Sequence, residues 1–176
     1  LTIAREWETG TMEQLISTPV RPPELILGKL LPYLGIGLVD LAIAVAMAVF
    51  LFQVPLRGSV LLLFGVGTVF IVATLAQGIL ISTITRQQLL ASQVAMVATF
   101  LPAFLLSGFA FAIANMPIAV RGITYIVPAR YFVALVKGLF LRGTGVTILW
   151  GDALCLLGFA ALMLVAAIAR TKRRLA

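Results

Sequence analysis

Long runs of apolar residues, separated by short polar breaks, cover most of the chain. The runs span about 30–52, 59–83, 89–114 and 148–169. Each has the roughly 20 apolar residues that a helix needs to cross about 30 Å of hydrocarbon. The hydrophobic fraction is 62% and the mean hydropathy is +1.15, whereas soluble domains are about 45–50% apolar. We therefore predict an all-α, polytopic membrane helix bundle.

The segment 115–147 breaks this pattern. Its apolar stretches are interrupted by prolines and basic residues, and its longest helical stretch, at about 131–141, is too short to cross a bilayer. Apolar helices of this length are typical of re-entrant or interfacial segments. We predict two short helices here that enter the membrane and return on the same side.

Residues 1–29 form a polar arm before the first apolar run. Four of the six acidic residues lie in it: Glu6, Glu8, Glu13 and Glu24. Thr11 followed three residues later by Gln14 fits a capping box at a helix start. Thr18-Pro19 ends that helix, because the residue before a proline disfavours helical geometry. The pattern predicts a helical arm (1–29) that leads into a membrane domain (30–176), or alternatively an interfacial helix lying on lipid.

The distribution of Lys and Arg predicts the orientation. Four spans place both ends on one side, and that side carries eight basic residues: Arg5, Arg21, Lys29, Arg86, Arg170, Lys172, Arg173 and Arg174. The other side carries five: Arg57, Arg121, Arg130, Lys137 and Arg142. Because positive charge accumulates on the cytoplasmic side, we predict that both ends are cytoplasmic. The net charge of +7 then reports topology, and we predict no nucleic-acid partner.

Few residues could support enzyme chemistry. The chain has no His and a single Cys, so zinc proteases and His-assisted serine nucleophiles are excluded. Ser107 has no visible base beside it, and we favour a packing role. Gly28-Lys29-Leu30 lacks the earlier glycine and the hydroxyl of a phosphate-binding loop. We predict no catalytic residue, no metal site and no cofactor bound by this chain.

Two polar residues inside the spans are candidates for a transport pathway. Asp40 lies in the first span and Gln77 in the second, where burial of a polar group in lipid is costly. A helix-to-helix hydrogen bond or a water-facing position is the simpler explanation, and we favour it. Small residues in the same spans suit close helix packing and give weak support to a dimer seam: Gly35, Gly37, Gly65 and Gly67.

The arm also resembles a known family signature. The run Arg5-Glu6-x-Glu8-x-Gly10-Thr11-x-Glu13-Gln14-Leu15-x-x-Thr18-Pro19, with Glu24, Gly28-Lys29 and Pro32-Tyr33 behind it, resembles that of ABC transporter type-2 permeases, most of all the bacterial multidrug-efflux-like branch. The looser stretches Leu106-Ser107-Gly108-Phe109, Asn115-Met116-Pro117 and Pro128-x-Arg130-Tyr131-Phe132 resemble the family's extracellular re-entrant segment. Family members carry a membrane helix, an extracellular domain and a second membrane helix before the arm. We therefore expect this chain to be the C-terminal portion of a longer permease.

The resemblance implies a function. In this family the arm is a coupling helix that docks on a separate ATPase subunit, which binds ATP and Mg. The residues expected to couple are Arg5, Glu6, Glu8, Gly10, Thr11, Glu13, Gln14, Thr18 and Pro19. The candidate pathway and gate residues are Asp40, Gln77, Asn115, Pro117, Pro128, Arg130 and Tyr131. The resemblance also implies a second permease copy or a paralogue, and a location in the bacterial inner membrane.

Three other functions are alternatives to an exporter of drugs or other amphiphilic molecules. A polysaccharide or lipid exporter of the same family remains open, since apolar helices suit many amphiphiles. A secondary transporter without an ATPase predicts several charged residues at mid-membrane, and only Asp40 fits that description. An intramembrane enzyme lacks catalytic partners.

Overall fold

The computed structural model of this protein describes residues 2–11, 14, 22–142 and 146–175. Every regular element among these residues is a helix, which confirms the all-α prediction. Four helical segments are long and apolar enough to cross a membrane: Pro23–Leu51, Val60–Thr85, Gln88–Leu106 and Trp150–Thr171. The chain is therefore a multi-pass membrane protein, with spans close to the four predicted apolar runs.

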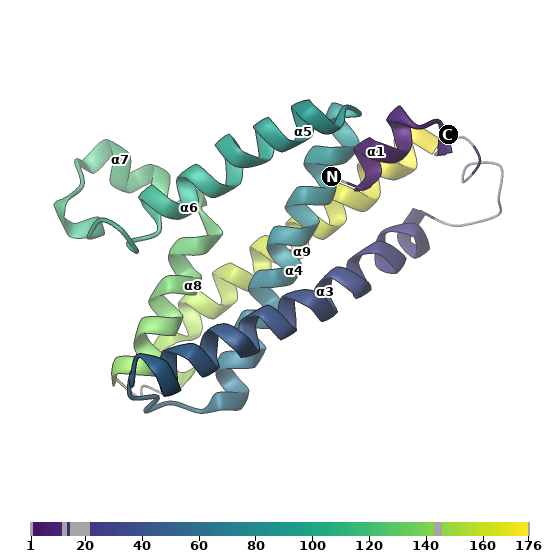
Figure 1. The fold of residues 1–176 in the computed structure, drawn as a ribbon. Coiled ribbons are helices and arrows are strands. Elements are labelled where there is room, and N and C mark those ends of the chain that lie inside the picture. The colour runs from purple at the N-terminus through teal and green to yellow at the C-terminus, as the bar shows by residue number, and fades with distance from the viewer. Residues whose placement is uncertain (1, 12–13, 15–21, 143–145, 176) are drawn as a thin grey trace.

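Helix α4 (Val60–Thr85) is the central element of the bundle. It lies between α3 (Pro22–Ala46), α8 (Pro128–Lys137) and α9 (Val146–Leu175), as Figure 1 shows. The α3 span continues through a π-helical turn, η1 (Met47–Leu51), before the chain reverses. Because α4 packs against three other helices, its position fixes the spacing of the whole bundle.

Glycines allow α3 and α4 to approach closely. A Cβ atom at Gly67 would lie 2.3 Å from Leu41 Cδ2, and one at Gly37 would lie 2.9 Å from Ile71 Cγ2. A Cβ at Gly35 or Gly65 would meet nothing within 4 Å. Two of the four small residues therefore serve the α3–α4 contact, as close packing predicts. The prediction of a dimer seam is then supported by Gly35 and Gly65 alone.

We expect Gly67→Leu to loosen α3 from α4. The larger side chain displaces Leu41, and overpacking of this kind costs about 1–3 kcal/mol. The measurement is the resistance of the detergent-purified protein to thermal unfolding. Gly158→Leu on α9 is the matched control, since a Cβ atom there would meet nothing within 4 Å. Equal stability of the two variants would contradict the close α3–α4 contact.

The third span is built from three consecutive helical pieces. These are α5 (Gln88–Ala95), the π-helical η2 (Met96–Phe100) and α6 (Leu101–Leu106). Pro102 has no N–H to donate, so the regular hydrogen-bond pattern of the helix is interrupted there. The π turn just before it accommodates this interruption, and the Leu101 N–H donates to the Met96 carbonyl. The span diverges from α4 after the turn that joins them (Figure 1).

The end of the third span differs from the prediction. The helix stops at Leu106, whereas the apolar run extends to residue 114. Gly108 adopts a left-handed conformation with φ of +82°, and the buried Ser107 hydroxyl accepts the Phe109 N–H at 3.2 Å. The boundary at 114 was therefore wrong, because a tight turn ends the helix inside an apolar sequence. Ser107 has the structural role that we favoured.

The segment after this turn folds into a bent helical pair. The pieces Ile118–Ile126 and Pro128–Leu141 meet at 90°, a geometry that a re-entrant loop and a broken span share. The first piece comprises α7 (Ile118–Ile123) and η4 (Thr124–Ile126), and the second comprises α8 and η5 (Gly138–Arg142). Two short helices are thus present as expected, and their return to the same side of the membrane stays a prediction.

Helix α8 runs along α4 and ends in the main apolar core. The rings of Phe70 on α4 and Phe132 on α8 stack with centroids 4.2 Å apart. Leu63, Leu139 and Phe140 then form a buried cluster close to the loop that joins the first two spans. The Gly58 N–H of that loop donates to the Leu139 carbonyl at 2.9 Å. These contacts hold α8 against the bundle along its length.

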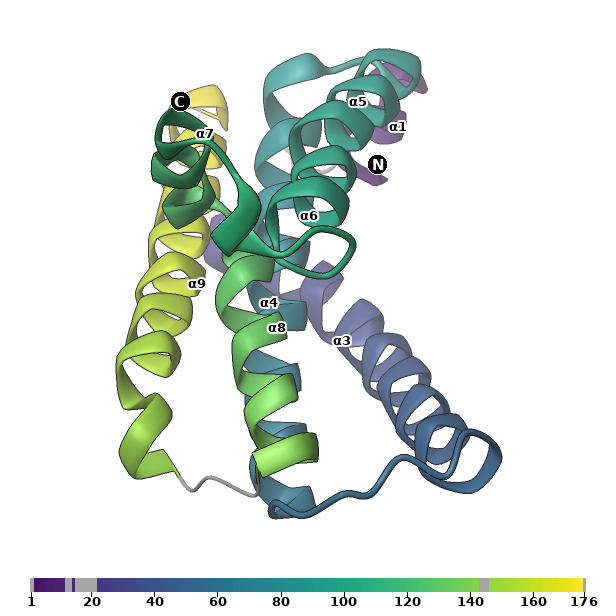
Figure 2. The same ribbon diagram turned by 90° about the vertical axis from the view of Figure 1, so that its left-hand side faces the viewer.

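The two ends of the described chain lie at the same end of the bundle. Figures 1 and 2 both show the N-terminal helix and the C-terminal part of α9 there, beside the turn between α4 and α5. We call this the arm end. A common location for both ends agrees with an even number of membrane passages, whereas their cytoplasmic location stays a prediction.

Candidate functional site

Helix α1 (Thr2–Glu8) packs against the spans at the arm end. Ile3 and Ala4 are 1% and 0% exposed. The Ala4 N–H donates to the Ser82 hydroxyl on α4 at 2.7 Å. The sequence predicted a helix from Thr11 and missed this earlier one. A seven-residue helix is not stable alone, so tertiary packing rather than local propensity accounts for α1.

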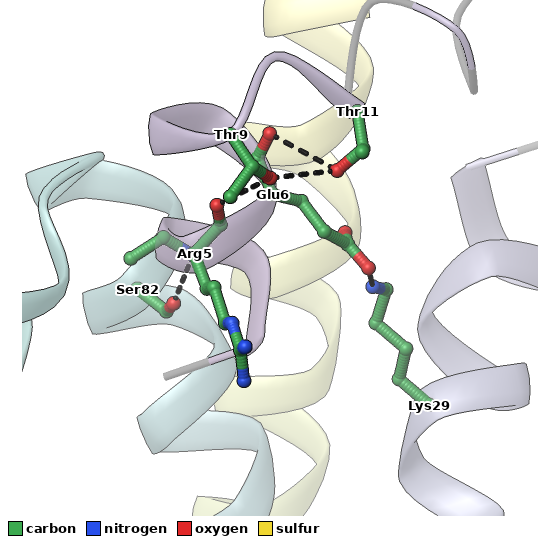
Figure 3. Close-up of polar contacts among 7 residues, drawn as sticks. Arg5, Glu6, Thr9, Thr11, Lys29 and Ser82 are labelled. Carbon is green, nitrogen blue, oxygen red and sulfur yellow. Dashed lines mark hydrogen bonds and ion pairs between the residues drawn. The ribbon is translucent and has the colours of Figure 1, made fainter.

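An ion pair joins α1 to the first span. The Lys29 ammonium on α3 donates to Glu6 Oε1, and the two side chains are only 16% and 25% exposed, respectively (Figure 3). The second carboxylate oxygen of Glu6 is buried and has no hydrogen-bond partner among the described residues. Glu6, which was predicted to dock on an ATPase, thus contacts this chain's own first span.

Glu8 and Trp7 bind the turn between α4 and α5. The Glu8 carboxylate accepts the N–H of Gln88, the first residue of α5, at 2.8 Å. A carboxylate at a helix N-terminus is stabilised by the helix dipole. The guanidinium of Arg86 lies 4.5 Å from the centroid of the Trp7 ring, a cation–π contact. The carboxylate predicted for docking is again used within the chain.

Threonine hydroxyls close the turn that follows α1. Gly10 has φ of +73°, a conformation that few other residues adopt without strain. The Thr9 hydroxyl donates to the Arg5 carbonyl at 2.9 Å and lies 3.0 Å from the Thr11 hydroxyl (Figure 3). Thr11 and Gln14 are exposed and have helical backbones. The predicted coupling residues Glu13, Thr18 and Pro19 lie outside the described residues.

A groove of about 430 Å³ lies between α1 and the spans. Its polar walls include Arg5, Lys29, Tyr33 and Gln88. Figure 3 shows the Arg5 side chain extending away from Glu6 and along the space between α3 and α4. Arg5 therefore lines this open groove and is exposed to solvent.

The predicted pathway residues are divided between separate places. Gln77 and Pro128 line one cavity of about 280 Å³ between α4, the third span, the bend at 123–129 and α9. Asp40 is exposed on α3, outside this cavity, and makes no hydrogen bond to any described residue. Asn115 and Pro117 line a different, more open pocket beside the end of the third span. The structure therefore places two of the seven candidates in one cavity and two others in a second pocket.

Arg130 and Tyr131 stabilise the bend itself. The Arg130 guanidinium lies 3.7 Å from the Tyr125 ring centroid and donates to the Thr124 hydroxyl. The Tyr131 hydroxyl donates to the Tyr125 carbonyl at 2.8 Å. These contacts join the two halves of the bent pair, so both residues have a positioning role in this structure.

A family model described as ABC-2 family transporter protein matches residues 1–169. This chain belongs to the ABC-2 transporter family. It is 47% identical over 175 residues to the probable multidrug ABC transporter permease YbhS of Escherichia coli K12, which covers 99% of this chain and 46% of YbhS. It is 30% identical over 178 residues to the inner membrane transport permease YhhJ of the same strain, covering 97% and 46%.

The ABC-2 similarity extends beyond bacteria. The chain is 30% identical over 143 residues to ABC transporter G family member 23 of Dictyostelium discoideum, covering 81% of this chain and 19% of that protein. No solved structure matches the chain. This ABC-2 chain spans about half the length of the bacterial relatives named above. The family resemblance drawn from the arm is confirmed.

Among the described residues, no group of three or more His, Cys, Asp or Glu side chains could hold a metal ion. Cys155 is exposed on α9 as a free thiol.

Proposed function

We propose that this chain forms the translocation path of an ABC exporter and is driven by a separate ATPase subunit that docks on the arm. One observation supports this mechanism above the others. Helix α1 contacts three spans through two hydrogen bonds and an ion pair. Its partners are Ser82 on α4, Gln88 on α5 and Lys29 on α3. A force applied to the arm would therefore reach the first three spans together.

The arm offers a polar surface to such a partner. Exposed positions at and after the end of α1 include Glu8, Thr9, Gly10, Thr11 and Gln14. The internal contacts of Glu6 and Glu8 hold this surface in place, and an ordered surface loses less entropy on docking. The sequence has no phosphate-binding loop of its own, so ATP and Mg would be bound by the ATPase.

The substrate class that we propose is drugs or other amphiphilic molecules. The spans and the 280 Å³ cavity are lined largely by apolar side chains, which suit apolar rings and chains better than the hydroxyl groups of a sugar polymer. YbhS, at 47% identity, is named a probable multidrug permease, and this agrees with the proposal.

We further propose that the arm end faces the bacterial cytoplasm, because the Lys and Arg residues of membrane proteins accumulate on the cytoplasmic side. A second permease copy or a paralogue would pack on the open faces of α3 and α4 that carry Gly35 and Gly65.

The complete permease should co-purify with its cognate ABC ATPase from detergent-solubilised membranes. Deletion of residues 2–11 should remove the ATPase from the complex while the spans still insert, because α1 makes no membrane passage. A permease that retains the ATPase without these residues would overturn the docking proposal.

A further inference from the structure

A half-open cavity at the side of the bundle has the features of a ligand site. It measures about 280 Å³ and is bordered by four separate elements. Its apolar walls include Phe70, Pro102, Ile126, Phe159 and Met163. Binding pockets are typically concave, mostly apolar and supplied with a few polar groups. Met163 adds a flexible and polarisable wall that can adapt to different shapes.

One residue that lines the cavity, Gln77, has a side-chain atom without a hydrogen bond among the described residues. The Oε1 atom of Gln77 is buried and accepts no hydrogen bond from a described residue. A buried polar atom without a partner is costly, and native proteins normally satisfy it. The nearby Thr74 hydroxyl is already used, since it lies 3.0 Å from both the Phe70 and the Ile71 carbonyls. Gln77 Oε1 therefore has the capacity to accept a hydrogen bond from a ligand.

The uncharged lining of the cavity limits the class of ligand that it can bind. None of its described lining residues is charged. Arg130, which is near in sequence to the bend, is held by Tyr125 and Thr124 and does not line the cavity. An ion placed there would lose its hydration without gaining an opposite charge, so a neutral ligand is favoured.

We propose that this cavity binds a neutral amphiphile with a compact apolar body and one hydrogen-bond donor, and that the donor bonds to Gln77 Oε1. Phenols and secondary amides have this chemistry. This proposal rests on the proposed export function for one step only, the export of the bound ligand. Binding itself requires neither ATP nor the ATPase.

Photolabelling tests the site directly. The complete permease is placed in lipid nanodiscs without nucleotide or ATPase and labelled with a phenol that carries a diazirine on its ring. The control probe is the methyl ether of the same phenol, which has the same apolar body and no donor. We expect saturable labelling of cavity residues such as Phe159 and Met163, mapped by mass spectrometry. The phenol should bind about tenfold more tightly than the ether, the value of one good hydrogen bond.

Two variants separate the hydrogen bond from the cavity. Gln77→Leu should weaken the phenol about tenfold and leave the ether nearly unchanged. Ala103→Phe places a ring in the cavity and should remove saturable labelling by both probes while Gln77 is retained. Gln93→Leu is the matched control, because Gln93 is exposed on the third span and should leave both probes unaffected.

Several results would overturn the proposal. Equal binding of phenol and ether would show that water satisfies Gln77, and unsaturable labelling spread over α3 would show partition into lipid only. An equal loss in Gln77→Leu and Gln93→Leu would also refute it. These results are independent of the export mechanism: a permease that binds the phenol at this site but recruits no ATPase would refute the proposed function and leave the cavity inference intact.

Discussion

Glu6→Lys is expected to release the arm from the first span and to reduce export at least tenfold. The substitution places two ammonium groups against each other in a site where both side chains are mostly buried. Removing one partner of a buried ion pair typically costs about 3–5 kcal/mol, and the partial exposure here places the effect near the lower value. The spans should still insert, since their apolar lengths are unchanged.

Limited proteolysis and export assays measure this effect. In the complete permease, the bond after Arg5 should become accessible to trypsin in Glu6→Lys, while the amount of permease in the membrane stays normal. The double variant Glu6→Lys with Lys29→Glu restores opposite charges and should recover most of the protection and the export. A double variant no better than either single variant would show that the ion pair does not hold the arm.

Glu13→Lys carries the second large expected effect. Of the three acidic residues predicted for coupling, Glu6 and Glu8 contact this chain. Direct docking by a carboxylate therefore rests on Glu13. Breaking a desolvated charge pair at an interface costs about 2–5 kcal/mol, whereas an exposed rim charge costs far less. Export and the amount of co-purified ATPase should fall together by tenfold or more, with normal membrane insertion.

Met12→Ala is the companion variant for Glu13→Lys. The sequence places Met12, Leu15 and Ile16 at i, i+3 and i+4, on one face of the predicted helix. The variant tests whether this apolar face, rather than the charges of the arm, holds the arm to lipid or to the bundle. Suppose that Glu13→Lys retains ATPase binding and export while Met12→Ala destabilises the permease. The arm would then be an interfacial anchor, and the coupling proposal would lose its main support from the sequence.

Hydrophobic runs predicted the spans well because a membrane requires long apolar helices whatever their neighbours are. The end of the third span was missed for a local reason. Residues 107–112 remain mostly apolar, and only the backbone of Gly108, with φ of +82°, ends the helix at Leu106. Composition does not reveal such a turn, although a Ser-Gly pair is a weak signal of one.

The arm contacts could not be predicted from local patterns. Glu6 meets Lys29 across 23 positions, and Glu8 meets Gln88 across 80. Such pairings depend on how the helices pack. The sequence did contain one usable signal, since Ser82, Thr83 and Arg86 are polar residues at the end of an otherwise apolar span. The polar positions of the spans similarly included Gln77, but only the fold distinguishes it from the outward-facing Asp40.

The proposed exporter is powered by ATP through a separate subunit. The most direct measurement is the transport of a fluorescent amphiphile by the purified complete permease in proteoliposomes, with and without its ATPase. We predict transport only with the ATPase and hydrolysable ATP, lost in Glu13→Lys and unchanged when the proton gradient is dissipated. Transport by the permease alone, driven by an ion gradient, would contradict the account.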